Sequence, residues 1–120
     1  MGEKVAIVGS RSWTDYEMVR DYVYSLADDD VVVSGGARGP DEWGQIYAEE
    51  RGLDTLIFPA DWATHGKRAG MLRNIDIVKA CVRLVAFWSD ESKGTAHSIG
   101  LARKAGKPVL VFHPGGIAKT

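Results

Sequence analysis

The chain has 120 residues, of which 45% are hydrophobic and 26% charged, and its formal net charge is −1. These values are typical of a globular protein with one domain over residues 1–120, and they exclude a global basic field for non-specific nucleic-acid binding, although a local basic patch stays open. The single cysteine, Cys81, excludes an internal disulfide. No apolar run reaches the roughly 20 residues of a membrane span, and the N-terminus lacks a signal-peptide core, so we expect a cytoplasmic protein without membrane contact.

The first predicted strand covers residues 5–9, an apolar run that ends in glycine. The spacing of apolar residues then predicts a helix up to Leu26, with Thr14 or Asp15 as its N-cap. Residues 31–33 form the second predicted strand. A second helix begins at Pro40 and ends at Gly52, as expected of proline in the first turn and glycine at the C-cap.

The apolar face of this second helix is assigned to Trp43, Ile46 and Tyr47. Residues 53–58 form the third predicted strand, and residues 61–67 are interpreted as a polar connection.

A third helix follows with an apolar stripe at Met71/Leu72, Ile75 and Val78, and residues 82–88 form the fourth strand. After a polar loop, a fourth helix opens at Gly94 and closes at Gly106. The last predicted strand covers residues 108–112, and the tail over residues 113–120 is expected to be loose.

Five strands that alternate with four helices predict an α/β protein with a Rossmann-like, doubly wound parallel sheet and helices on both faces. In such sheets, ligands bind beyond the carboxyl ends of the strands, near the point where the strand order reverses. Functional residues are therefore expected in the loops that follow the strands.

The loop over residues 34–41 joins a buried strand to a helix start and is rich in glycine. Glycines let backbone N–H groups approach a phosphate, and a helix N-terminus favours negative charge. The pattern matches neither the dinucleotide fingerprint nor the P-loop, and the alternative is a simple tight turn.

Each of the other loops after strands also carries hydroxyl, glycine or cationic groups, which suits a phosphorylated ligand. The predicted ligand-binding residues are Ser10, Arg11, Ser34, Gly35, Gly36, Arg38, Gly39, Lys67, Arg68, Arg73, Ser92, Gly94 and Thr95. The three histidines lie on separate segments without metal-ligand spacing, so no metal site is predicted.

Three tryptophans, Trp13, Trp62 and Trp88, fall at or just past strand ends, where an indole could stack on a purine. The alternative is that they pack helix ends onto the sheet. Trp43, on a helix face, is assigned to the core.

Nearly all of residues 4–112 resembles a known protein family. The motifs are Gly9-Ser10-Arg11 with Trp13-Thr14-Asp15, Ser34-Gly35-Gly36-Ala37-Arg38-Gly39-Pro40-Asp41, Ala60-Asp61-Trp62 with Gly66-Lys67, Gly70 with Arg73-Asn74, and Ser92-Lys93-Gly94-Thr95. Together they resemble the SLOG superfamily, most closely its small, single-domain YspA-like branch. The resemblance implies a Rossmann-like fold that binds a nucleotide or a nucleotide-derived ligand, and it adds Asn74 to the candidate site.

Relatives divide into nucleotide sensors, phosphoribohydrolases that cleave the N-glycosidic bond of nucleoside monophosphates, and DprA-like proteins that bind single-stranded DNA. The hydrolase motif Pro-Gly-Gly-x-Gly-Thr with a following glutamate is incomplete here, because Ala96-His97-Ser98 follow Thr95. Asp90, Glu91 and Asp41 are the candidate carboxylates for that chemistry. The Arg73-Asn74 pair resembles the DprA branch, whereas the net charge of −1 disfavours DNA.

The resulting hypothesis is a module that binds or senses a small nucleotide, with no further cofactor required. Hydrolysis of the N-glycosidic bond and binding of single-stranded DNA remain as alternatives, and a homodimer is open.

Overall fold

The computed structural model describes residues 2–118, with side chains for residues 2–116, and contains one six-stranded sheet in the order β3-β2-β1-β4-β5-β6. The strands are β1 (Lys4–Gly9), β2 (Val31–Ser34), β3 (Asp54–Ile57), β4 (Arg83–Phe87), β5 (Val109–His113) and β6 (Gly116–Ala118). The first five strands are parallel, and β6 runs antiparallel to β5. The predicted Rossmann-like α/β fold is confirmed.

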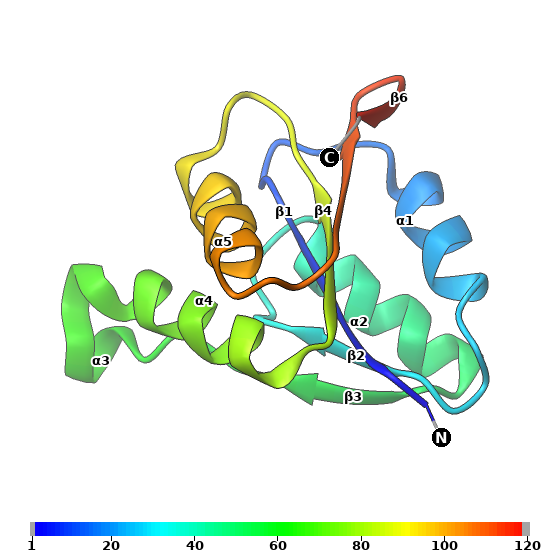
Figure 1. The fold of residues 1–120 in the computed structure, drawn as a ribbon, viewed down its shortest axis with the longest axis horizontal. Coiled ribbons are helices and arrows are strands. Elements are labelled where there is room, and N and C mark those ends of the chain that lie inside the picture. The colour runs from blue at the N-terminus through cyan, green and yellow to red at the C-terminus, as the bar shows by residue number, and fades with distance from the viewer. Residues whose placement is uncertain (1, 119–120) are drawn as a thin grey trace.

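Helices cover both faces of this sheet (Figure 1). One face carries α1 (Tyr16–Tyr24) and α2 (Pro40–Arg51), and the other carries α4 (Ala69–Ala80) and α5 (Lys93–Lys104). Successive residues of β1 feed the two cores, because side chains alternate along a strand. Val5 and Ile7 belong to the core under α1 and α2, whereas Ala6 and Val8 belong to the core under α4 and α5.

Within the sheet, β2 and β3 lie on one edge side of the central strand β1, and β4 and β5 lie on its other edge side. The strand order therefore reverses between β1 and β4, and the loops after these two strands lie side by side before they lead to helices on opposite faces of the sheet.

Several predicted helix boundaries are confirmed. Asp15 caps α1, with its Oδ1 accepting the amide of Met18 at 3.2 Å. Pro40 occupies the first turn of α2, and Gly52 ends that helix with a φ of 83°, a left-handed conformation that favours glycine.

The predicted apolar face of α2 is wrong in part. Ile46 is exposed, while Trp43 and Tyr47 are half-buried at the margin of the core. The residues that α2 buries are Pro40, Asp41, Gly44 and Ala48. The helix face with the small residues Gly44 and Ala48 packs on the sheet, because Gly44 allows the helix backbone to lie against Ile7.

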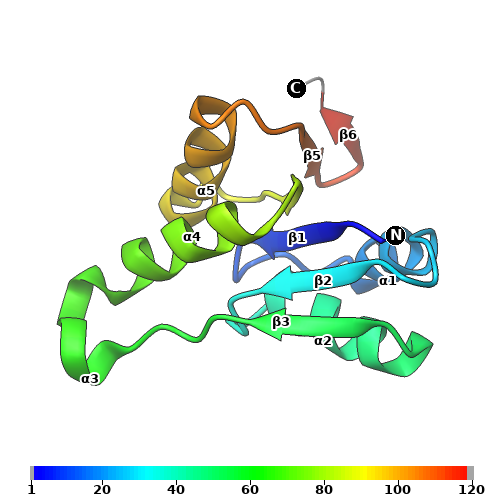
Figure 2. The same ribbon diagram turned by 60° about the horizontal axis from the view of Figure 1, so that its bottom comes forward.

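The stripe predicted for α4 is also shifted, because Met71 is 56% exposed and the buried residues are Ala69, Asn74, Ile77 and Val78. Residues 61–67, predicted to be a polar connection, form the short helix α3 (Trp62–His65) and the start of a 3₁₀ turn over Gly66–Arg68. These elements project as an arm beyond the strand ends, so the first turn of α4 has little sheet beneath it (Figure 2).

The tail is more ordered than predicted, because β6 pairs with β5 as a hairpin over residues 116–118. Its last two residues, 119 and 120, lie outside the described residues. Among residues 2–118, every helix is too short or too polar to cross a bilayer.

Candidate functional site

A cleft of about 680 Å³ lies at the point where the strand order reverses. It is lined by the loops after β1 and β4, the first two turns of α5, the first half of α4 and part of the projecting arm. Of the predicted site residues, those lining the cleft are Ser10, Arg11, Asp41, Trp62, Lys67, Arg73, Asn74, Asp90, Ser92, Gly94 and Thr95.

Hydroxyl groups tie the two loops of the cleft together. The Oγ of Ser10 accepts the amide of Ser89 at 2.9 Å and lies 3.3 Å from the Oγ1 of Thr95. The Oγ of Ser12 lies 2.8 Å from the Oγ of Ser89. The first turn of α5 is therefore fixed against the ends of β1 and β4.

The N-terminus of α5 faces the cleft with free backbone donors. Ser92 caps the helix by accepting the amide of Thr95 at 3.4 Å. The amides of Lys93 and Gly94 donate to no acceptor within residues 2–118. Free first-turn N–H groups, reinforced by the helix dipole, form a favourable environment for an anion.

The loop that leads into α5 is held in an uncommon backbone conformation. Asp90 and Glu91 have φ values of 52° and 51°, in the left-handed region that favours glycine. The indole N–H of Trp88 donates to the carbonyl of Ser92 at 3.1 Å and anchors the far end of the loop. This loop sets the position of the free amides relative to the cleft.

Positive charge exceeds negative charge in this cleft, although the chain as a whole is slightly acidic. Four cationic side chains line it, against two carboxylates, Asp41 and Asp90. The cations are Arg11, Lys67, Arg73 and Lys93. Arg11 is exposed and has no ion-pair partner within the described residues, so its guanidinium is available to a ligand.

The glycine loop after β2 has a different role from the predicted phosphate cradle. The amide of Gly35 donates to Oδ2 of Asp41 at 3.2 Å, and the amide of Gly36 donates to Oγ of Ser34 at 3.2 Å. Both amides are therefore already bonded within the protein. Ser34, Gly35, Gly36, Arg38 and Gly39 all lie outside the cleft lining.

The glycines of this loop instead allow close packing. A Cβ on Gly39, whose φ is 92°, would lie 2.8 Å from the carbonyl oxygen of Ser10. A Cβ on Gly35 would lie 2.5 Å from Nη1 of Arg73. The loop thus brings α2 and α4 against the ends of β1 and β2.

Asp41 is a buried clamp between strand ends. Its Oδ1 accepts the amide of Gly9 at 3.2 Å while Oδ2 accepts that of Gly35. Burial raises the pKa of Asp41 to about 6, although Arg73 and the two amides oppose the shift. Of the other candidate carboxylates, Asp90 lines the cleft and the exposed Glu91 does not.

The tryptophans separate into three environments. Trp13 is only 1% exposed, packs edge-on against Phe87 and donates to the carbonyl of Asp15, so the prediction that it stacks on a base is wrong. Trp88 is half-buried and lies outside the cleft lining. Trp62 is 53% exposed and lines the cleft, which leaves it as the accessible candidate.

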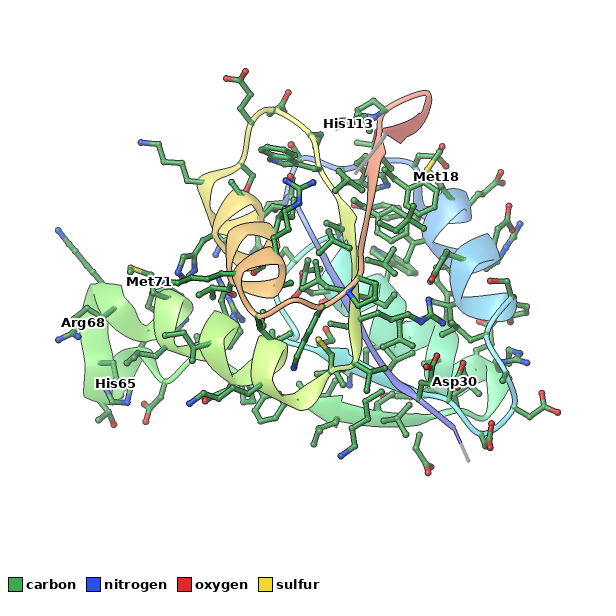
Figure 3. The ribbon with its side chains drawn as sticks, viewed as in Figure 1. Met18, Asp30, His65, Arg68, Met71 and His113 are labelled. Atoms are coloured by element: carbon green, nitrogen blue, oxygen red, sulfur yellow. The ribbon has the colours of Figure 1, made fainter. Side chains whose placement is uncertain are left out.

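Two predicted cationic residues, Arg38 and Arg68, are exposed but do not line the cleft. Figure 3 shows His65 and Arg68 at the far end of the projecting arm, whereas Met71 lies closer to α5. Within residues 2–118, no three histidine, cysteine or acidic side chains lie close enough to hold a metal ion.

A family model described as "YspA, cpYpsA-related SLOG family" matches residues 3–65. The chain belongs to this SLOG family. A curated relative, the Gene 61 protein of Mycobacterium phage D29, is 42% identical in an alignment 123 residues long. The alignment covers 91% of this chain and 95% of that protein.

Two solved structures share the fold of this SLOG protein. DNA processing protein A (DprA) from Streptococcus pneumoniae superposes with a TM-score of 0.74 at 22% identity, over 92% of this chain and 50% of that one. DprA from Helicobacter pylori, whose structure was described for its single-stranded DNA binding mode, gives 0.67 at 23% identity over 92% and 65%. The chain thus spans half to two thirds of these structures.

Sequence reasoning missed several residues that line the cleft, among them Ser12, Ser89, His97 and Ser98. His97 and Ser98 follow Gly94 by three and four positions, a spacing that places them on the same helix face. This helical spacing in the sequence could have predicted that His97 and Ser98 line the site with Gly94. Ser12 and Ser89 come from two loops whose proximity depends on the strand order.

Proposed function

We propose that this protein binds a nucleotide or a nucleotide-derived phosphorylated ligand in the cleft between the loops after β1 and β4. The observation that carries the proposal is the pair of free amides at Lys93 and Gly94, which open onto a cleft with an excess of cationic side chains. A phosphate satisfies such amides and neutralises such charge.

The volume of the cleft supports a ligand larger than phosphate. Its volume of about 680 Å³ lies within the usual range for small-molecule sites. In the proposed arrangement, Lys93, Gly94 and Arg11 hold the phosphate, and the base reaches towards Trp62 and Met71, the exposed apolar side chains of the lining.

Calorimetric titration with AMP, ADP-ribose, NAD and a cyclic nucleotide tests the proposal, with inorganic phosphate as the reference ligand. We expect at least one nucleotide to bind more tightly than phosphate. Native mass spectrometry of the freshly purified protein would detect a co-purifying nucleotide and count subunits in the same spectrum. Absence of heat with every nucleotide at millimolar concentration would refute the proposal.

Binding of single-stranded DNA is the second candidate. It is favoured by the exposed Trp62, by Lys67 and Arg68 beside it on the arm, and by the shared fold with Helicobacter pylori DprA, whose structure was described for its single-stranded DNA binding mode. A gel shift with a labelled oligonucleotide that weakens with added salt would support it. An unshifted band at low salt would exclude this role.

Cleavage of an N-glycosidic bond is supported by one carboxylate, Asp90, which lines the cleft and has no hydrogen-bond partner within residues 2–118. Such a carboxylate could activate water or assist departure of the base. Release of free adenine from AMP, lost in Asp90→Asn, would identify the protein as an enzyme. Stoichiometric binding without free base would identify a binding module.

A further inference from the structure

Asn74 of α4 links three groups beside the cleft and is only 8% exposed. Its Oδ1 accepts the Nε–H of Arg73 at 3.2 Å. Its Nδ2 lies 3.4 Å from the carbonyl oxygen of Gly94 and 3.2 Å from Nδ1 of His97. The amide of Asn74 therefore connects α4 to the first two turns of α5.

The chemistry of these neighbours determines which way the Asn74 amide faces. The Nε–H of arginine can only donate, and a backbone carbonyl can only accept. Exchanging the oxygen and nitrogen of Asn74 would place two donors together at Arg73 and two acceptors together at Gly94. The Nδ2 group must therefore face His97.

This orientation selects one tautomer of His97. Because Nδ2 of Asn74 donates, Nδ1 of His97 accepts with its lone pair, and the proton of the neutral ring lies on Nε2. His97 lines the cleft, and its Nε2 has no hydrogen-bond partner within the described residues. The cleft thus contains an imidazole donor with one nitrogen held by the protein.

The support for this ring extends across the sheet edge. Nη1 of Arg73 donates to the carbonyl of Gly35 at 3.1 Å, and the amide of Gly35 donates in turn to Asp41. The chain of contacts from Asp41 to His97 joins the loop after β2 to α4 and α5. A side chain supported in this way loses little freedom when it meets a ligand.

We propose that His97 donates from Nε2 to an oxygen of the ligand's phosphoribosyl group, with Asn74 as the positioning residue. The inference rests on the proposed function of nucleotide binding. The ring lies one helical turn from the free amides of Lys93 and Gly94, and Asn74 contacts both the Gly94 carbonyl and the ring. His97 is therefore close to the phosphate end of the site.

The first test is independent of any ligand. Nitrogen-15 NMR of the imidazole groups distinguishes the two neutral tautomers through their long-range proton couplings. We expect Nε2–H for His97 in the wild type and loss of that preference in Asn74→Ala. A wild-type ring protonated on Nδ1 alone would overturn the proposal.

The second test compares two variants that each keep one half of the imidazole. His97→Asn places an amide near Nδ1 and removes the donor at Nε2, whereas His97→Gln carries an amide donor towards the Nε2 position. By calorimetry with AMP, we expect about fivefold weaker binding for His97→Asn and near wild-type binding for His97→Gln, as for the loss of one hydrogen bond. The control is His65→Asn, an exposed histidine outside the cleft lining.

Each outcome of the second test has one meaning. Equal affinity in all three variants, or an equal loss in both His97 variants, would overturn donation from Nε2 while leaving nucleotide binding intact. A wild type that binds none of AMP, ADP-ribose, NAD and a cyclic nucleotide would overturn the proposed function itself. Weaker binding of inorganic phosphate by His97→Asn would identify a phosphate oxygen as the acceptor, and a loss confined to ribose 5-phosphate and AMP would identify a ribose oxygen.

Discussion

The amide of Gly35 donates to Oδ2 of the buried Asp41 at 3.2 Å, so a donor that would face a phosphate in a phosphate-binding loop is already bonded within the protein. The same carboxylate accepts the amide of Gly9 at the end of β1. One side chain thereby connects two neighbouring strand ends. The first amides of α5, at Lys93 and Gly94, have no such partner within the described residues, which is why the proposed phosphate site lies there.

Burial of Asp41 predicts a specific pH dependence of stability. With its pKa raised from 3.8 to about 6, Asp41 binds a proton more tightly in the folded protein, so its contribution to stability is full below about pH 4 and is lost as pH rises through 6. This difference corresponds to about 3 kcal/mol. Asp41→Asn lacks the titration, so the stability advantage of the wild type over this variant should shrink between pH 4 and 7.

Denaturant unfolding of both proteins across this pH range measures the difference, and titrations common to both cancel. A gap that stays constant from pH 4 to 7 would contradict a raised pKa at Asp41. A gap that grows with pH would indicate that the carboxylate is favoured in the folded state.

Two helix glycines should respond oppositely to alanine. A Cβ on Gly44 would lie 2.8 Å from Cγ2 of the buried Ile7, so Gly44→Ala should lower the free energy of unfolding by about 1–3 kcal/mol. Gly100, within α5, has no atom within 4 Å of that position, so Gly100→Ala should raise it by about 0.5–1 kcal/mol. Equal effects of the two variants would contradict the packing of α2 on β1.

The left-handed conformation of Glu91 predicts a stabilising substitution. The left-handed conformation costs a non-glycine residue roughly 1–2 kcal/mol of conformational free energy, and glycine avoids part of this cost. The Glu91→Gly substitution should therefore increase the free energy of unfolding by up to about 1 kcal/mol. Because Glu91 does not line the cleft, the affinity for AMP should change little. Destabilisation measured by thermal unfolding would show that the φ of 51° is not a source of strain.

The free guanidinium of Arg11 predicts a loss of affinity when its charge is removed. Arg11→Gln should weaken AMP binding by about ten- to a hundredfold, as for loss of a hydrogen bond to a charged group. Arg103→Gln, exposed in the last turn of α5 and outside the cleft lining, is the matched control. Equal affinities of both variants by calorimetry would place the phosphate elsewhere.

Trp62 should report binding by fluorescence, since it is the most exposed of the four tryptophans and lines the cleft. Stacking on a base is worth about 1–3 kcal/mol, so Trp62→Ala should weaken AMP by about tenfold while changing ribose 5-phosphate little. If both ligands weakened alike, Trp62 would have a role other than stacking on the base.

The fold was largely predictable because buried parallel strands are short apolar runs, and because helix starts carry local signals such as the Asp15 cap of α1 and Pro40 in the first turn of α2. Which residues of each helix face the sheet was less predictable. Met71 continues an apolar stripe, yet it is exposed because α4 extends past the sheet at this point. In α2, Gly44 and Ala48 are buried against the sheet, whereas Ile46 is exposed.

The site was predictable in its location but not in its details. Strand order determines that the loops after β1 and β4 meet, and no local pattern reveals this order. Glycines at an anion site and glycines that permit close packing have the same appearance in a sequence. Only the hydrogen bonds of Gly35 and Gly36 distinguish the two roles.

The most direct test of the central claim is an amide NMR titration of the nitrogen-15-labelled protein with AMP. We predict that the Lys93 and Gly94 amide resonances shift most, that Arg11 and His97 follow, and that Gly36 stays nearly unchanged. Shifts centred on Gly35 and Gly36, or no shift at millimolar AMP, would contradict a phosphate site at the N-terminus of α5.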